Sequence, residues 1–348
     1  SGGFGNDPYT TGLMAAALEA PPLVPAVATA IGSLPHTDPQ AAAELVLEAH
    51  PRFPAAPQLP MRTPLEGIVA QWARALPEVT VEHDGSIAVG GVTNEPAVAI
   101  FDPEAHGGLL AFLDTAAGDR RPPRVKVQIA GPLTLGVALL RSGLPLEQAF
   151  RRGGEAARAW AIATEDLVEE RLPGSALVLF FDEPALVAWQ RDDAPLEHEA
   201  AIDVLSGALA APACPTGVHV CGAGNRRLAL EAGPQVLGVE VGSDLVDDAD
   251  VLARHLDADG WIAWGAVPTD RPVGESVDPL WRALVGVWCE LTRRGCDPVR
   301  LRTQSVVTPA CGLAGHGPSQ AERTLRLARE LADRAHDQAI AARLTLGA

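Results

Sequence analysis

Lysine is almost absent from this 348-residue sequence, and nearly all of its basic residues are arginine. Acidic residues outnumber basic ones by 44 to 27, which gives a formal net charge of −17 at pH 7. Proteins that bind nucleic acids need clustered lysine and arginine to neutralise phosphate groups. The composition therefore argues against a nucleic-acid partner, although it does not identify a substrate.

The sequence also lacks long apolar runs and an even set of cysteines. No run of about 18 or more apolar residues occurs, so we expect no transmembrane helix and no membrane partner. Five cysteines are an odd number, which argues against a disulfide framework and favours the reducing cytoplasm. The segment Ser1–Thr11 lacks the features of a signal peptide. We expect residues 1–22 to form a flexible tail.

What the sequence does contain is a regular alternation of apolar, β-branched runs with stretches of helical period. Eight such strand–helix units favour a closed parallel barrel over an open sheet. We therefore predict one α/β domain over residues 23–348, a TIM (β/α)8 barrel. The expected strands are Ala28–Leu34, Arg52–Gln58, Val125–Ala130, Ala176–Asp182, Gly217–Cys221, Val236–Val241, Trp261–Val267 and Ser305–Thr308.

One segment departs from this alternation. Val79–Val92 contains Asp84-Gly85 between two alternating runs, which is a hairpin signal. We expect this hairpin to be an excursion between the second and third barrel strands.

Four potential metal ligands lie at the ends of expected strands: His219, Cys221, Glu240 and Cys311. Side chains two residues apart on a strand point to the same side, so His219 and Cys221 can reach one metal. Active sites of such barrels lie at the carboxyl ends of the strands, where Glu240 and Cys311 also occur. One imidazole, two thiolates and a carboxylate form a plausible tetrahedral zinc set.

Each of these residues also has a simpler explanation. A histidine and a cysteine on one strand are often plain core residues, and Glu240 could pair with an arginine instead of a metal. Cys289, beside Trp288 on an expected helix, is interpreted as a core cysteine.

Two further strand ends carry features suited to a small ligand. Asp182-Glu183 follows a hydrophobic strand, where an acidic pair is positioned for ligand binding; an N-cap is the alternative for Glu183. Ile31-Gly32-Ser33 ends the first strand, and Gly32 allows close backbone approach to a carboxylate. The alternative for this segment is an ordinary turn.

Together these motifs resemble the cobalamin-independent methionine synthase family, in particular its C-terminal catalytic barrel. The matching elements, in the family's order, are Ile31-Gly32-Ser33-Leu34-Pro35-His36, Val125–Thr134, Asp182-Glu183-Pro184-Ala185-Leu186, His219-Val220-Cys221, Glu240 in its strand, and Pro309-Ala310-Cys311-Gly312-Leu313. The resemblance implies zinc at the four potential ligands. It also implies substrate binding by Ile31, Gly32, Ser33, Glu66 and Asp182, with Asp182 also catalytic.

The chain departs from that family in three respects. The extra N-terminal barrel is missing, the region at the end of the seventh expected strand, Gly265–Asp270, contains no histidine, and no folate-tail motif is found. We expect a single-barrel zinc methyltransferase that forms methionine from homocysteine, with a corrinoid protein or a methylated folate as donor. The alternatives are alkyl transfer to another thiol, such as coenzyme M, and a non-catalytic thiol- or metal-binding barrel.

Overall fold

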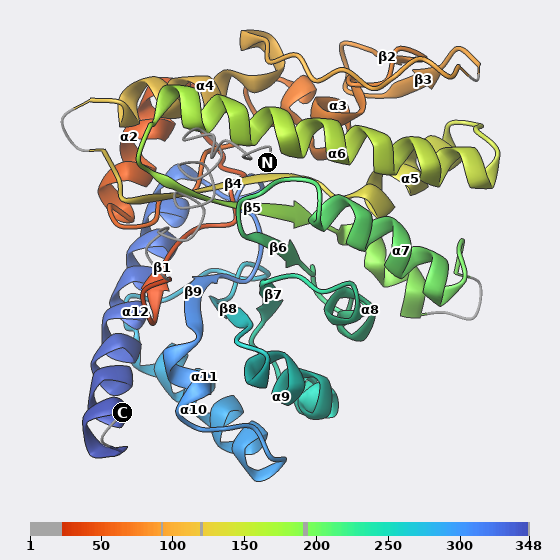
Figure 1. Cartoon of the computed structure of the whole chain (residues 1–348). Coiled ribbons are helices and arrows are strands. Elements are labelled where there is room, and N and C mark those ends of the chain that lie inside the picture. Colours follow the sequence, from red (N-terminus) through yellow and green to blue (C-terminus); the bar gives the residue numbers. More distant parts are fainter. Residues whose placement is uncertain (1–22, 92, 119–120, 191–193, 347–348) are drawn as a thin grey trace, which may run out of the picture.

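The computed structural model describes residues 23–91, 93–118, 121–190 and 194–346 and places a curled parallel sheet at its centre (Figure 1). The sheet has seven strands in the order β1-β9-β8-β7-β6-β5-β4, and every neighbouring pair is parallel. The strands are β1 Val27–Ala28, β4 Arg124–Ala130, β5 Ala176–Asp182, β6 Thr216–His219, β7 Val236–Glu240, β8 Trp261–Val267 and β9 Ser305–Pro309.

Helices surround this sheet on its outer face (Figure 1). No helix of the described residues is long and apolar enough to cross a membrane. The α-helices are α2 Pro39–Ala49, α3 Ile68–Ala73, α4 Pro103–Ala116, α5 Pro132–Arg141, α6 Leu146–Arg171, α7 His198–Leu209, α8 Arg226–Glu231, α9 Ala249–Asp257, α10 Asp278–Arg293, α11 Arg300–Thr303 and α12 Pro318–Leu346. Short 3-10 helices are η1 Pro64–Glu66, η2 Pro184–Gln190 and η3 Ser243–Asp248.

The structure confirms the α/β class, but the segment expected as the second strand, Arg52–Gln58, is not a regular strand. It makes two backbone hydrogen bonds to β4 and two to the segment that follows β1, so it bridges both edges of the curled sheet. Lys126 N on β4 donates to Pro54 O at 2.9 Å, and Gln58 N donates to Gly32 O at 3.0 Å. The seven strands and this connecting segment give a TIM-like arrangement.

Local backbone chemistry explains why two expected strands are shortened. Pro54 and Pro57 have no N–H and cannot continue a hydrogen-bonded ladder. Of the first expected strand, Ala28–Leu34, only Ala28 lies in a regular strand, β1 Val27–Ala28. Further along, Gly32 has a φ of +145°, a conformation that interrupts a strand.

Two apolar clusters fill the structure. The larger one lies between the sheet and the helices. The smaller one is built from strands and the segment beside them, so it fills the inside of the curled sheet. Its buried members are Val27, Phe53, Val178, Phe180, Val236, Ala263 and Val306.

The expected hairpin segment contains β2, Val79–Val81, paired antiparallel with β3, Ile87–Val89. The pair forms a separate two-stranded sheet that contacts α3 (Figure 1). Val92, the last residue of the expected segment, lies outside the described residues, as does the expected tail 1–22.

A buried arginine on α6 ties the hairpin region to the barrel. Arg152 is 1% exposed and makes a two-point contact with Glu78, through Nε to Oε1 at 2.6 Å and Nη2 to Oε2 at 2.7 Å. It also donates to the carbonyl of Glu95 at 2.9 Å and pairs with Glu155. The segment that carries β2 and β3 is thus held to α6 at both of its ends.

Replacing Arg152 with alanine is expected to lower the free energy of unfolding by about 3–5 kcal/mol, because Glu78 would stay buried without its counter-charge. Chemical denaturation of wild type and variant measures this difference. Arg151→Ala is the matched control, since Arg151 has a 45% exposed side chain and its loss should cost at most about 1 kcal/mol. Equal losses in the two variants would contradict the prediction.

The histidine of helix α4, His106, is enclosed by three aromatic rings. His106 is fully buried, with the rings of Trp72, Phe101 and Trp160 centred 5.4, 5.2 and 5.0 Å from its own. The amide of Asp102 donates to its Nδ1 at 3.2 Å. Burial lowers the pKa of His106 from 6.5 to about 4, against the attraction of Asp102. The imidazole is therefore neutral at pH 7.

Below pH 6.5 the unfolded chain takes up a proton at His106, whereas the folded protein does so only near its pKa of about 4. The stability from this residue is therefore complete above pH 6.5 and is lost as the pH falls toward 4, by about 3 kcal/mol in total. Chemical denaturation measures the free energy of unfolding of wild type and of His106→Leu between pH 7 and 4. The excess stability of the wild type over the variant should decrease as the pH falls. A difference in the free energy of unfolding that does not change with pH would contradict the assignment. The control variant is His198→Leu, because His198 is exposed.

Candidate metal and substrate site

Three of the expected metal ligands meet at the carboxyl ends of β6 and β9. His219 ends β6, Cys221 follows two residues later, and Cys311 lies two residues beyond β9. One ligand atom from each lies within 4.8 Å of the other two. The Sγ atoms of Cys221 and Cys311 are 4.0 Å apart, which is too far for a disulfide. Two sulfurs bound tetrahedrally to one zinc would be about 3.8 Å apart.

The environment of His219 fits a metal ligand. The residue is 2% exposed, and neither ring nitrogen has a hydrogen-bond partner within the described part of the chain. Buried polar atoms are rarely left unpaired, so this ring points to a ligand that is not part of the protein. An imidazole and two sulfurs are the donors that zinc prefers, with room for a fourth ligand.

The two cysteines differ in acidity. The neighbouring Cys221 thiol and His219 lower the pKa of Cys311, whereas Cys311 and burial raise the pKa of Cys221. Ionisation of one of the two sulfurs therefore disfavours ionisation of the other. A divalent cation would favour release of the second proton.

The structure does not bring Glu240 into this group. Glu240 ends β7 with an exposed side chain and is absent from the set of close ligand atoms among the described residues. Partial burial and the charges of Asp270, Asp244 and Cys311 raise its pKa. Glu240 lines a cavity of about 390 Å³ that shares Arg271 and Pro272 with the cavity beside Cys311. Zinc ligation by Glu240 therefore stays a prediction that requires its side chain to turn.

Asp182 lies beside the three clustered ligands. It ends β5 and pairs with His219 across the two strands. The side chain is buried, and its Oδ1 has no hydrogen-bond partner in the described ranges. Burial raises the pKa of the carboxyl, while Lys126 and His219 lower it. A buried carboxylate with a free oxygen is suited to a cationic group of a ligand.

Glu183 has a different role. Its carboxylate accepts hydrogen bonds from Leu133 N and Thr134 N at 2.8 Å each and from Thr134 Oγ1 at 2.5 Å. These contacts satisfy the free amides at the start of α5. The capping alternative thus applies to Glu183, although to α5 and not to the helix that follows it.

The Ile31–Ser33 segment lies next to the loop that carries Cys311. A Cβ on Gly312 would stand 1.9 Å from Ser33 Oγ, and Leu313 N donates to Ser33 O at 2.8 Å. Gly32 is needed because a Cβ there would stand 2.0 Å from Gln128 Nε2. The turn is therefore packed tightly between the barrel interior and the expected metal site.

Glu66 is engaged elsewhere. Its carboxylate accepts from Leu59 N at 2.7 Å, from Arg62 Nε at 2.8 Å and from Gly108 N at 3.3 Å. These contacts anchor the loop that starts η1 and leave little of the carboxylate for a substrate.

The prediction that Cys289 is a core cysteine is wrong, because this residue is exposed.

An open cavity of about 640 Å³ adjoins Cys311. Arg271, His316 and Gln320 line it together with Thr269, whose carbonyl accepts from His316 Nε2 at 2.9 Å. The cavity leaves space for a second reactant beside the cysteine. The sequence contains no signal for it, because its walls come from the loop after β8 and from the loop after β9 with the start of α12, which are far apart in the chain.

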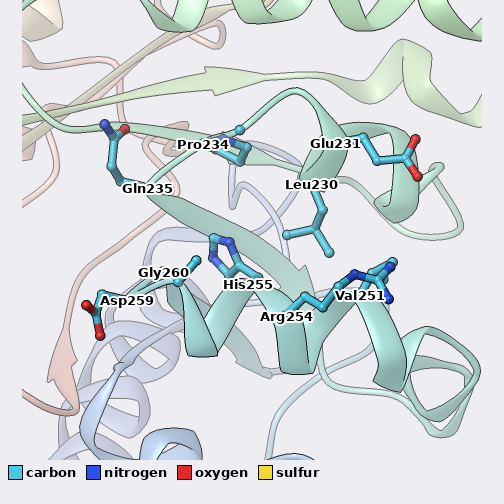
Figure 2. Close-up of a pocket in the computed structure, with 11 residues that line it drawn as sticks. Leu230, Glu231, Pro234, Gln235, Val251, Arg254, His255, Asp259 and Gly260 are labelled. Atoms are coloured by element: carbon cyan, nitrogen blue, oxygen red, sulfur yellow. The ribbon is translucent and has the colours of Figure 1, made fainter.

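Another cavity, of about 410 Å³, lies at the opposite end of the sheet (Figure 2). Its residues come from α8, α9 and the loops that precede β7 and β8. Gln235 and Gly260, labelled in Figure 2, come just before the amino ends of these strands. This cavity is therefore remote from the carboxyl ends where the expected ligands meet.

The fold is similar to that of a solved structure described as a B12-independent methionine synthase from Shewanella sp. W3-18-1 in complex with selenomethionine. The TM-score is 0.60 at 13% sequence identity, and the match covers 91% of this chain and 99% of that one. No model of a protein family matches the chain, and no curated protein does. At this identity the comparison establishes one point: the chain shares its fold with that methionine synthase.

Proposed function

We propose that this protein is a zinc-dependent S-methyltransferase that converts homocysteine to methionine. The observation that carries the proposal is the cluster of His219, Cys221 and Cys311, which has an unpartnered imidazole and lies beside a buried carboxylate. The similarity of fold to a methionine synthase supports it.

The proposed site has separate places for the two ends of the substrate. His219, Cys221 and Cys311 would hold zinc, and Glu240 would be a fourth ligand. Bound zinc would supply ionisation of the substrate thiol at neutral pH. Asp182 would accept hydrogen bonds from the substrate ammonium, and the backbone and hydroxyl of Ile31–Ser33 would donate to its carboxylate.

These contacts would orient the substrate sulfur toward the open cavity beside Cys311, where the donor would present its methyl group. A sulfur–carbon bond forms, the bond from methyl to the donor breaks, and the thiol proton is released to solvent. The donor is a corrinoid protein or a methylated folate. The function is proposed to be cytoplasmic, in keeping with the reduced cysteines.

One experiment tests the proposal directly. Zinc-loaded protein is incubated with homocysteine and either methylcobalamin or methyltetrahydrofolate, and methionine is measured. Formation of methionine with one donor, and none after zinc removal, is the expected result. Methylation of coenzyme M in preference to homocysteine would favour general thiol alkylation, which does not need Asp182. Zinc binding without methyl transfer to any thiol would favour a non-catalytic barrel.

A further inference from the structure

The most unusual residue of the chain lies beneath this site. Lys126 is the only lysine among 27 basic residues. It lies on β4 and is fully buried, although lysine is among the residues least often buried. A lone buried lysine in a chain that otherwise uses arginine suggests a place that arginine cannot fill.

Lys126 connects the apolar interior of the barrel with the floor of the site. Its Nζ lies 4.6 Å from the ring centre of Phe180, a member of the interior cluster. The same atom donates to Ile31 O at 2.5 Å and to Gln128 Oε1 at 3.2 Å. Two hydrogen bonds and an aromatic face account for the three donors of an ammonium group.

The bond to Ile31 O sets the direction of the next amide. In a trans peptide the C=O and the following N–H point in opposite directions, so Gly32 N–H is turned away from Lys126. That N–H has no acceptor among the residues described. A cation on the carbonyl also polarises the peptide and strengthens the N–H as a donor. The N–H of Gly32 is therefore oriented and polarised to donate a hydrogen bond to an anion.

The charge of Lys126 also reaches Asp182, on the neighbouring strand β5. Lys126 and Asp182 are both buried on the paired strands β4 and β5, so the ammonium is a buried cation that attracts the buried carboxylate. A single buried cation thus acts on both groups that the proposed function assigns to the substrate, the amide for a carboxylate and the carboxylate for an ammonium.

We propose that Lys126 is the positioning residue that makes this site selective for thiols carrying an α-amino acid group. This inference rests on the proposed function. Lys126 does not touch the reacting sulfur; it holds the Ile31–Gly32 peptide with its N–H free and provides the counter-charge for Asp182. Arginine cannot replace it, because a guanidinium carries five donors and the enclosed space offers two acceptors.

The test compares two thiols on zinc-loaded wild type and Lys126→Met, a variant of similar length without the charge. Calorimetry should show binding of homocysteine weakened by about tenfold or more. Binding of 2-mercaptoethanol, which has neither carboxylate nor ammonium, should change less than about threefold. Zinc should stay at one per chain, and the KM for homocysteine should rise more than kcat falls. Lys126→Arg should not restore binding.

Equal weakening of both thiols, or unchanged homocysteine binding, would overturn the inference. A second measurement needs no variant: in protein labelled with 15N-lysine, the single side-chain amine signal belongs to Lys126. It should shift on addition of homocysteine and not of 2-mercaptoethanol, and an identical response to both would refute the role. Wild-type protein that binds no homocysteine would overturn the proposed function as well, whereas wild-type affinity in Lys126→Met would overturn the inference alone.

Discussion

Cys311→Ser is expected to abolish stable zinc binding and, with it, methyl transfer. The sulfur of Cys311 is one of three ligand atoms within 4.8 Å of one another, and the neighbouring Cys221 thiol and His219 lower the pKa of its thiol. A hydroxyl is a much weaker ligand for zinc than a thiolate, so affinity should fall by at least about 100-fold. Elemental analysis after dialysis against zinc measures the loss, and zinc-edge X-ray absorption counts the sulfurs around the metal.

Cys221→Ser should behave like Cys311→Ser, because its sulfur lies 4.0 Å from that of Cys311. Cys289→Ser is the matched control, since this cysteine is exposed on α10 and remote in sequence from every expected ligand. It should retain one zinc per chain and one additional sulfur when homocysteine is added. The same zinc content in all three variants would refute the assignment.

Asp182→Asn is expected to weaken homocysteine binding by about tenfold to hundredfold. The reason is the loss of a charge-assisted hydrogen bond to the substrate ammonium, worth about 1.5–3 kcal/mol. The substitution keeps the shape of the side chain, so the fold and zinc content should not change. Calorimetry with zinc-loaded protein gives the dissociation constants.

The control is a change of ligand. 4-Mercaptobutyrate has the chain and carboxylate of homocysteine without the ammonium, and its affinity should be nearly equal in wild type and Asp182→Asn. If both thiols lose affinity equally, Asp182 acts through the surrounding structure and not on an ammonium. If the wild type prefers a sulfonate thiol, alkyl transfer to such a thiol becomes the better proposal.

Much of the fold could be predicted from the sequence, because local patterns of apolar residues mark its strands and helices. Buried parallel strands are continuous apolar runs, and β5 Ala176–Asp182 and β8 Trp261–Val267 have the predicted bounds. Prediction failed at Arg52–Gln58, where composition suggested a strand but prolines prevent a continuous ladder. Its backbone hydrogen bonds to both sheet edges depend on where those edges lie, which no local pattern contains.

The sequence by itself determined which strand ends have potential metal ligands and substrate-binding residues. The two-residue spacing of His219 and Cys221 places both on one side of a strand, and parallel strands align their carboxyl ends, so Cys311 could be expected nearby. Only the tertiary structure decided which candidates meet. It separates the Glu240 carboxylate from the cluster, engages Glu66 with loop amides and places Lys126 under Ile31. Side-chain partners of this kind depend on packing between segments distant in sequence, and such contacts have no periodic signature in the chain.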